Sequence, residues 1–511
     1  MKALAALPRL EIELSGRPLA PALSAALGEA RVRRDLARPA QVELVFFLAA
    51  GESPPLPKAG EPLELRIHDH RRSLFAGEVT AVQIRYGGDG ELELRVRGYD
   101  LLHRLRKRRP MRAHVESTVA DLAREMVSDL GLKVVAAEPG PLEQRLLQHR
   151  SNDFELLTEQ AARHGLYPVL RASELHLLTL EGSGDAVPLT VGDDVLECRF
   201  ELNGEPSCRS VEVSAWDPAH GESHRASARH PRIGRRVPIE ADPSRFRSDG
   251  TVQLAGRRVD NAKAAEAVAR GELDRRTGAE VTFWAIAEGN PQLVPGRPVE
   301  VEGAVKDFCG RYVLTAVEHR IDGTSGYVTE LTTEPPSLPL DRSPRTRREP
   351  GLDAAWGKVI RVDDPDGLGR VRATLPARGD LETGWLEVVC PGAGNGKGLV
   401  ALPDVGDRVL ILLLDGEAGH GVVLGGLHGP RKVRDSGVDG GRVRRYNLRT
   451  AGGQSLMLDD SADTVRLENS RGTWVELGPK AVRLHAAADL TIEAPGRKLK
   501  IRAKTIDFER A

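Results

Sequence analysis

The residues with the clearest capacity for chemistry form the glycine-rich stretch GAGNGKG at 392–398, just after the apolar run WLEVVC. Glycines and a lysine behind a strand are typical of a phosphate-binding loop. Such a loop also needs a glycine five residues before the Gly-Lys pair and a Ser or Thr after the lysine. These two positions hold Pro391 and Gly398. The following VALPDVGD contains a proline and a turn, so no helix N-terminus faces a phosphate. We therefore expect a barrel connection and no bound nucleotide.

Other groups of polar residues give weaker signals. His68 and His70 share a face of an alternating strand, but no third metal ligand is predictable nearby, so a hairpin turn explains them better. The basic run RLRKRRP at 104–110 suggests a nucleic-acid patch, although a solvated junction facing an acidic partner is the simpler interpretation. No nucleophile elbow or catalytic carboxylate pair is recognisable. We expect no catalytic residue, metal or cofactor, and interpret His319 as a packing or hydrogen-bonding residue.

The composition argues against several classes of function. The 511 residues include 73 basic and 74 acidic side chains, and the net charge of −1 gives no overall field to attract nucleic acid or an anionic membrane. Aromatic residues make up only 4%, which leaves few platforms for base stacking. The N-terminal stretch is broken by Pro8, so we expect synthesis in the cytoplasm without a signal peptide. The four cysteines lack CxxC spacing and are expected to be reduced.

The elements that position these residues are mainly short alternating strands, separated by frequent glycines and prolines. Helical spacing appears around 117–166, where Thr118 with Asp121 and Asn152 with Glu155 mark helix starts. The predicted order of domains is a first β-barrel at 1–111, an α/β insert at 112–190, a second β-barrel with one helix at 191–335, a linker at 336–352, a small closed barrel at 353–430, a connector at 431–445 and a strand repeat at 446–511.

The segment 446–511 repeats pairs of apolar residues two positions apart, and successive pairs start seven to ten residues apart. Each pair predicts a strand with an apolar face only two side chains wide, which a single chain cannot bury. Three identical chains wound about one axis would enclose these faces; a single-chain solenoid is the alternative. Seven strands about 4.8 Å apart would make a needle roughly 35 Å long. The predicted core pairs are Leu456/Leu458, Val465/Leu467, Val475/Leu477, Val482/Leu484, Leu490/Ile492, Leu499/Ile501 and Ile506/Phe508.

The order of these parts resembles the VgrG spike of contractile injection systems, equivalent to the fused hub and spike of a contractile phage baseplate. Each single match is weak, but the ordered set runs through the whole chain. The matching hub residues are Phe75, Gly77, Tyr99, Phe154, Gly165, Pro295, Gly296, Tyr312 and His319. The matching OB-fold residues are Gly369, Trp385, Gly394, Pro403, Val405, Gly406, Asp407, Val409, Asp415, Val423, Gly425 and Gly429.

The resemblance implies a mainly β protein with two hub β-barrels, an α/β insert, an OB-fold and an intertwined trimeric β-helix needle. It implies a homotrimer that docks on a hexameric inner tube, is surrounded by baseplate proteins and carries a PAAR-like tip protein. Such a spike is structural: it punctures the target envelope when the sheath contracts. No lysozyme-like insertion precedes the needle, so we expect no enzyme. The spike is expected to be assembled into a type VI, phage-tail or released extracellular particle.

Two alternatives belong to other functional classes. An OB-fold nucleic-acid-binding protein would need a basic groove with aromatic residues, whereas the barrel offers only Trp356 and Trp385. A spike with cell-wall hydrolase activity would have to hold its catalytic site in the insert, at 117–180. Filter binding at low salt tests the first alternative, and a peptidoglycan zymogram tests the second.

Overall fold

The computed structural model describes residues 7–49, 55–68, 70, 73–88, 91–149, 151–217, 222–255, 261–337, 353–413, 421–430 and 432–509. Asp415, Asp69 in the histidine cluster and most of the predicted linker lie outside the described residues. The chain forms two compact units, Met1–Leu427 and His428–Ala511. The described part of the chain contains no helix with the length and apolar character required to cross a membrane.

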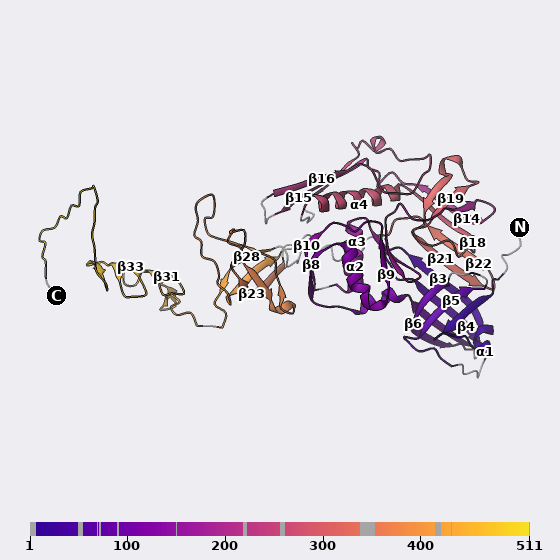
Figure 1. Ribbon diagram of the computed structural model, residues 1–511, viewed down its shortest axis with the longest axis horizontal. Coiled ribbons are helices and arrows are strands. Elements are labelled where there is room, and N and C mark those ends of the chain that lie inside the picture. The colour runs from indigo at the N-terminus through magenta and orange to yellow at the C-terminus, as the bar shows by residue number, and fades with distance from the viewer. Residues whose placement is uncertain are drawn as a thin grey trace. The chain divides into compact units, whose positions relative to one another are not determined.

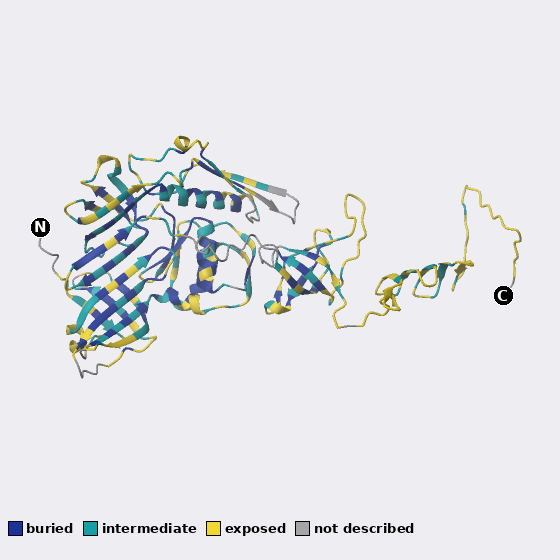
Figure 2. Cartoon of the chain, turned by 180° about the vertical axis from the view of Figure 1, so that it is seen from behind, coloured by how far each residue is buried: buried dark blue, intermediate teal, exposed yellow. Residues whose placement is uncertain are grey.

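An 11-stranded sheet organises the first unit, in the order β14-β18-β22-β21-β3-β4-β7-β6-β5-β1-β2. Its strands alternate buried and exposed residues, as Figure 2 shows, because successive side chains of a strand point to opposite faces. The strands of its N-terminal half are β1 (Leu10–Leu14), β2 (Arg17–Pro18), β3 (Leu27–Asp35), β4 (Gln41–Leu48), β5 (Pro62–Ile67), β6 (Ser73–Tyr86) and β7 (Leu92–Tyr99); a short helix, α1 (Pro21–Ala25), precedes β3.

The two predicted β-barrels are joined by this one sheet. Strand β21 (Ala316–Asp322) of the second region pairs antiparallel with β3 of the first, with His319 opposite Val32. The sequence pattern predicts each barrel separately, whereas pairing across almost three hundred residues depends on which edges meet in space. The remaining strands of the sheet are β14 (Val195–Leu202), β18 (Val281–Glu288) and β22 (Gly326–Thr332). Each half has its own core, around Phe46 and Leu65 in one and Phe283 and Tyr312 in the other.

The insert between the two halves is the α/β region that the sequence predicts. Both capping boxes are confirmed, at Thr118 with Asp121 before α2 (Val119–Val127) and at Asn152 with Glu155 before α3 (Asp153–Arg163). The helices pack with a three-stranded sheet of β11 (Tyr167–Arg171), β12 (Glu174–Leu178) and β9 (Lys133–Ala136). A separate two-stranded ribbon is formed by β8 (Arg112–Ser117) and β10 (Glu143–Gln148), and the 3-10 helices η1 (Leu101–Lys107) and η2 (Ser128–Leu130) flank these elements.

The second β-region carries its predicted helix, α4 (Ala262–Glu280), which lies along β15 and β16 in Figure 1. Alanines of α4 and Leu273 form a small core against Val211 and Val213 of β15. The three-stranded sheet that packs against this helix has the order β16-β15-β17. A second three-stranded sheet has the order β13-β19-β20. Their strands are β15 (Ser210–Asp217), β16 (Glu222–Ala228), β17 (Thr251–Ala255), β13 (Val187–Thr190), β19 (Pro298–Glu302) and β20 (Gly310–Val313), with 3-10 helices η3 (Pro243–Phe246) and η4 (Lys306–Phe308).

The small barrel has a six-stranded sheet in the order β25-β24-β23-β27-β28-β26. Alternate residues of its strands, such as Val359, Ala373 and Ile411, fill a core that is closed to solvent. Its elements are β23 (Asp353–Arg361), β24 (Arg372–Leu375), η6 (Pro376–Arg378), β25 (Leu381–Glu382), β26 (Glu387–Val388), β27 (Arg408–Leu413) and β28 (Gly421–Leu427).

The second unit contains a five-stranded antiparallel meander and one short hairpin. The meander runs in chain order through β31 (Arg445–Arg449), β32 (Ser455–Asp459), β33 (Thr464–Glu468), β34 (Trp474–Leu477) and β35 (Val482–His485), and the hairpin is β29 (Val438–Asp439) with β30 (Arg442–Val443).

Candidate functional site

The apolar pairs of the C-terminal unit line up across the meander. Leu456 lies opposite Leu467, and Leu458 lies opposite Val465. The same register continues through β34 and β35, so that one face carries two columns of apolar side chains. We call this face the apolar double column. Its members are Tyr446, Leu458, Val465, Leu477 and Val482 in one column and Leu448, Leu456, Leu467, Val475 and Leu484 in the other.

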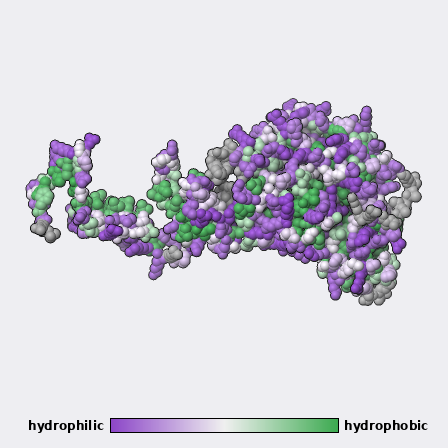
Figure 3. All heavy atoms as spheres, in the orientation of Figure 1, coloured by the Kyte–Doolittle hydropathy of each residue, from purple (hydrophilic) through white to green (hydrophobic). Residues whose placement is uncertain are grey.

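Among the described residues of the single chain, no layer of side chains covers the double column. The side chain of Leu484 is 57% exposed, and those of Leu467 and Leu477 are about as open to solvent. Figure 3 shows the hydrophobic atoms as a green strip along this unit. Exposed large apolar patches on a folded protein mark surfaces that bind another molecule. The double column is therefore the strongest candidate for a functional surface.

The opposite face of the meander is polar and has its own partners. Arg466 donates to Glu468 at 3.1 Å and to Glu476 at 3.0 Å, and its guanidinium lies 4.5 Å from the centre of the Trp474 ring. Arg483 pairs in register with Glu476 on the same face. A sheet that is apolar on one face and charged on the other presents the apolar face to a partner and the charged face to water.

The predicted strand repeat is confirmed for four pairs and wrong for three in the single chain. The four confirmed pairs lie on β32, β33, β34 and β35 in chain order. They are Leu456/Leu458, Val465/Leu467, Val475/Leu477 and Val482/Leu484. The three remaining pairs fall in the described residues 486–509, where no strand occurs.

The residues of these three pairs correct the sequence-based prediction. We expected all six side chains to lie on strands and to be buried in the centre of a trimer. In the single chain the expected strands are absent from these described residues, whereas burial in a trimer stays a prediction. Ile492, for example, lies outside any strand and is 65% exposed, and Phe508 is 92% exposed. A strand with a two-residue face gains too little from local contacts to form without a neighbour. The six exposed residues are Leu490, Ile492, Leu499, Ile501, Ile506 and Phe508.

Sequence reasoning missed the first members of the double column. Tyr446 and Leu448 on β31 have the same spacing of two residues as the later pairs, and they lie opposite Leu458 and Leu456. The spacing alone was a sufficient signal for this pair.

Two matching hub residues meet around one arginine. The guanidinium of Arg106 lies 5.5 Å from the centre of the Tyr99 ring and 5.2 Å from the centre of the Phe154 ring. Tyr99 is the last residue of β7 in the large sheet, whereas Phe154 lies in the first turn of α3 in the insert. A cation between two aromatic faces is attracted to both. The contacts of Arg106 therefore stabilise the packing of the insert against the large sheet. Two other cations of the basic run also have acidic partners, because Arg104 pairs with Glu78 and Arg108 with Asp129.

Two matching glycines allow close approach of backbones. A Cβ on Gly77 would stand 2.2 Å from the carbonyl oxygen of Tyr99 and 2.6 Å from the buried ring of Phe75. Gly165 ends α3 with φ +70°, and a Cβ there would stand 2.9 Å from Cα of Gly271 on α4. Any larger residue at these positions would push the two backbones apart.

The other hub matches build the second half of the large sheet. Tyr312 is buried beside Phe283 and donates its hydroxyl to the carbonyl of Phe308 at 2.8 Å. Gly296 has φ +77°, and the carbonyl of the preceding Pro295 accepts a hydrogen bond from Arg171 of the insert at 2.6 Å. These residues serve the fold.

His319 is buried in this half and hydrogen-bonded at both ring nitrogens. Nε2–H donates to the carbonyl of Leu293 at 3.1 Å, and the Tyr327 hydroxyl donates to Nδ1 at 3.1 Å. Burial, with a smaller contribution from the nearby Arg34 cation, lowers the pKa of His319 to about 3. The imidazole is therefore neutral at physiological pH, as a packing and hydrogen-bonding residue requires.

The OB-fold matches lie mainly at turns. Gly369 and Gly406 have φ of +71° and +90°, which favour glycine. Asp407 accepts from the backbone N–H of Asp404 at 2.8 Å beside Pro403, and Trp385 lies 5.4 Å from the guanidinium of Arg361. Gly425 faces open space on β28.

The GAGNGKG stretch is a turn rather than a phosphate cradle. Gly394 and Lys397 exchange backbone hydrogen bonds at 3.1 and 3.2 Å and form an isolated bridge. No helix follows before β27 in this described stretch, so the backbone N–H groups do not converge on an anion.

Sequence reasoning also missed an ordered turn in the OB-fold. Arg370 is 5% exposed, and its guanidinium donates to Asp364 at 2.7 and 2.9 Å. This hydrogen bonding lowers the pKa of Asp364 well below its usual range. The local spacing DPDGLGR is the only sequence signal for this turn.

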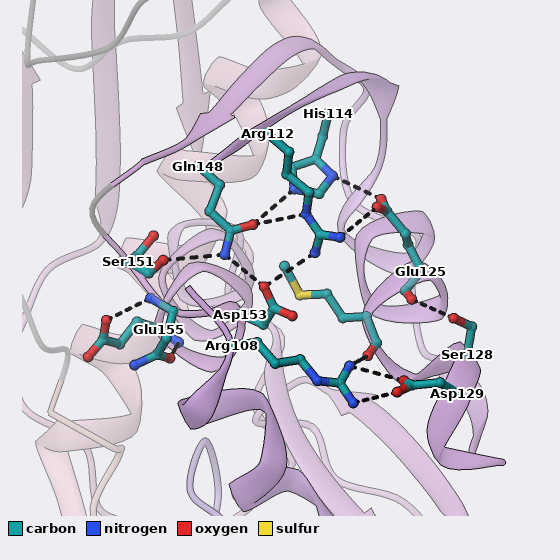
Figure 4. Close-up of polar contacts among 12 residues, drawn as sticks. Arg108, Arg112, His114, Glu125, Ser128, Asp129, Gln148, Ser151, Asp153 and Glu155 are labelled. Carbon is teal, nitrogen blue, oxygen red and sulfur yellow. Dashed lines mark hydrogen bonds and ion pairs between the residues drawn. The ribbon is translucent and has the colours of Figure 1, made fainter. Parts of the chain in front are cut away.

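A polar network in the insert is the place to look for a hidden catalytic site (Figure 4). Asp153 accepts from Gln148 at 2.8 Å and from Arg112 at 3.2 Å, and its side chain is only 3% exposed. His114 is held between Glu125 at 2.9 Å and Gln148 at 3.3 Å. The arginine and amide donors both hydrogen-bond the buried carboxylate. The network positions the β8–β10 ribbon against α2 and α3.

The other face of this ribbon packs on the OB-fold. Leu147 and Ala113 are paired in register and join the core of the small barrel. Arg145 donates to the carbonyl of Glu382 at 3.1 Å. Because alternate strand residues face opposite sides, the ribbon holds the insert with one face and the barrel with the other.

The histidine cluster of the first sheet forms no metal site in the described residues. His68 lies 2.6 Å from Glu11 through Nδ1, and no group of three or more His, Cys, Asp or Glu side chains with metal-binding geometry occurs in the described part of the chain.

The sequence matches two family models. Residues 355–428 match the type VI secretion system/phage-baseplate injector OB domain, and residues 60–323, just over half of the chain, match the Alg8 N-terminal domain. No curated protein matches the sequence.

Several solved structures share the fold at low sequence identity. One is the E. coli c3393 protein, which is described as a type VI secretion system component with structural similarity to the T4 tail proteins gp27 and gp5. Its sequence is 14% identical, the TM-score is 0.55, and the match covers 82% of this chain and 99% of that chain. The Francisella PdpA-VgrG complex in its lidded form has 10% sequence identity and a TM-score of 0.57. This match covers 94% of this chain and 80% of that chain. The 43 kDa tail protein of prophage MuSo2 from Shewanella oneidensis has 16% sequence identity and a TM-score of 0.50. This match covers 63% of this chain and 97% of that chain.

The match over 60–323 establishes the family of the hub region, the second match identifies the small barrel, and the structures confirm the predicted fold class. The chain therefore belongs to the Alg8 N-terminal domain family, contains a segment that matches the injector-type OB domain, and has the fold of the VgrG structures.

Proposed function

We propose that this chain forms the homotrimeric central spike of a contractile injection machine. The observation that carries the proposal is the apolar double column. It is two side chains wide, and most of its side chains are exposed, with only Val465 and Val475 partly buried. The polar partners of the meander lie on its other face. Three copies facing one axis would bury these columns against one another.

The trimer also accounts for the last three apolar pairs. Residues 486–509 continue the spacing of the columns but form no strand in the single chain. Neighbouring chains would supply the edges that these segments lack, so the needle would extend as the chains wind together. A needle without free edges resists bending and unfolding, which is what force transmission requires.

The hub of the proposed spike docks on a hexameric inner tube. Each chain supplies two β-rich halves joined by the β21–β3 pairing, so three chains present six similar halves around the axis. We further propose that baseplate proteins surround this ring and that a PAAR-like protein caps the needle. The spike is made in the bacterial cytoplasm and acts after assembly into an injection particle. Its role is mechanical and non-enzymatic, because the insert network is used for packing.

Light scattering on the purified full chain tests the trimer. A mass of three chains at micromolar concentration is expected, and removal of residues 446–511 should return the mass to that of one chain. A well-folded monomer with an intact C-terminal unit would refute the proposal.

A further inference from the structure

The charge of the C-terminal unit changes sign along the chain. From 455 to 493 there are seven acidic and four basic residues, a net charge of −3. The stretch RKLKIRAK at 497–504 contains five basic residues and no acidic one. We call this stretch the basic band. A local charge of this size is hidden in the whole-chain balance, which is nearly neutral.

The basic band is open to solvent and alternates with the apolar pair. Lys498, Lys500 and Arg502 flank Leu499 and Ile501, and every residue of the band is exposed. Alternation places the three cations on the face opposite the apolar pair in any extended conformation. In the described residues no carboxylate forms an ion pair with any of the five cations, in contrast to Arg466 on the meander.

We propose that the basic band binds the anionic phosphate head groups of a lipid bilayer. The inference rests on the proposed trimer, in which each of three chains would contribute five cations around one narrow axis. Lysine is a compact charge on a flexible stem and binds phosphate without fixed geometry. Three of the five cations are lysines, which suits a fluid surface of many anions.

The uninterrupted sign of the band favours a bilayer over an acidic protein. Protein surfaces carry interspersed positive and negative charges. A surface that binds such a partner needs charges of both signs as well, like the group of Arg466, Glu468 and Glu476 on the meander. A leaflet with anionic lipids presents one sign everywhere. At physiological ionic strength such attraction is screened beyond about 8 Å, so the band acts only where the needle touches the membrane.

Co-flotation of the full-length protein with vesicles tests the inference. One set of vesicles is pure phosphatidylcholine, and the other contains equal parts phosphatidylcholine and phosphatidylglycerol. The test variant carries Lys498→Gln, Lys500→Gln and Arg502→Gln. The control variant removes the same number of exposed cations from the acidic part of the unit, through Arg471→Gln, Lys480→Gln and Arg483→Gln. Light scattering establishes the mass of all three proteins first.

The wild type and the control are expected to bind the anionic vesicles and to lose binding as salt rises. The test variant should bind at least about ten-fold more weakly, because each Lys or Arg near an anionic leaflet adds to the attraction. Equal binding by the trimeric test variant, or equal binding to both vesicle types, would overturn the inference while leaving the trimer intact. Binding to soluble polyglutamate but not to vesicles would assign the band to an acidic protein and would also overturn it. A monomeric wild type would refute the proposed function, and the inference with it.

Discussion

Replacement of Leu484 by aspartate separates the trimeric needle from a single-chain sheet. Leu484 is 57% exposed in the single chain and lies opposite Val475 in the double column. In a monomer the change places a carboxylate in water at an exposed site, so stability should change by less than about 0.5 kcal/mol. In the proposed trimer the same change places three carboxylates in the apolar centre.

The magnitude of the effect follows from the burial that the trimer would provide. Full burial of a leucine side chain stabilises by about 1.5–3 kcal/mol. Only the 57% of each Leu484 side chain that is exposed in the single chain remains to be buried, so loss of three of them costs roughly 3–5 kcal/mol, about two to four powers of ten in the trimer dissociation constant. Burial of the unpaired carboxylates adds several kcal/mol for each ion. The variant should therefore be monomeric at every concentration at which the wild type is trimeric.

Size-exclusion chromatography with light scattering measures the effect. The matched control is Arg483→Asp, one residue away, because a shift of one residue along a strand moves a side chain to the other face. Arg483 faces Glu476 on the polar side, so this control should cost a few tenths of a kcal/mol and keep the trimer. A trimeric Leu484→Asp protein, or equal loss of assembly in both variants, would refute the assignment of the inward face.

Three further predictions concern the first unit. Gly165→Ala should lower the free energy of unfolding by about 2–4 kcal/mol in a urea titration, because φ is +70° and the added Cβ meets Gly271; an unchanged midpoint would contradict the observed close approach. The pKa of His319 is about 3 in the folded protein and 6.5 in the unfolded chain. The contribution of His319 to the free energy of unfolding is therefore complete above pH 6.5 and is lost as the pH falls toward 3, with a loss of about 2 kcal/mol at pH 5. Urea midpoints of His319→Gln should lack this part of the pH dependence, and curves parallel to those of the wild type would refute the prediction. Asp153→Ala should lower the free energy of unfolding by about 2–4 kcal/mol because it leaves buried donors unpaired. The control Asp129→Ala, at an exposed ion pair, should lower it by less than about 1 kcal/mol. Equal shifts of the two variants in thermal unfolding would contradict this difference.

Local patterns in the sequence predicted much of the fold. The capping boxes at Thr118 and Asn152 formed as expected, because a cap depends only on residues three positions apart. The alternation of β7 predicted which residues are buried. The pairing of β21 with β3 and the use of Arg106 between Tyr99 and Phe154 were not predictable, since each joins segments that are distant in the chain.

The candidate site shows the same division. The spacing of apolar pairs by itself was enough to predict a narrow apolar face in 446–511, because side chains two apart on a strand share one side. Only the tertiary structure decided the register that aligns Leu456 with Leu467 and Val475 with Leu484, and that the chain stops forming strands after His485, which leaves Ile492 exposed. Pairing depends on the free energy of neighbouring strands in space, which a one-dimensional pattern does not contain.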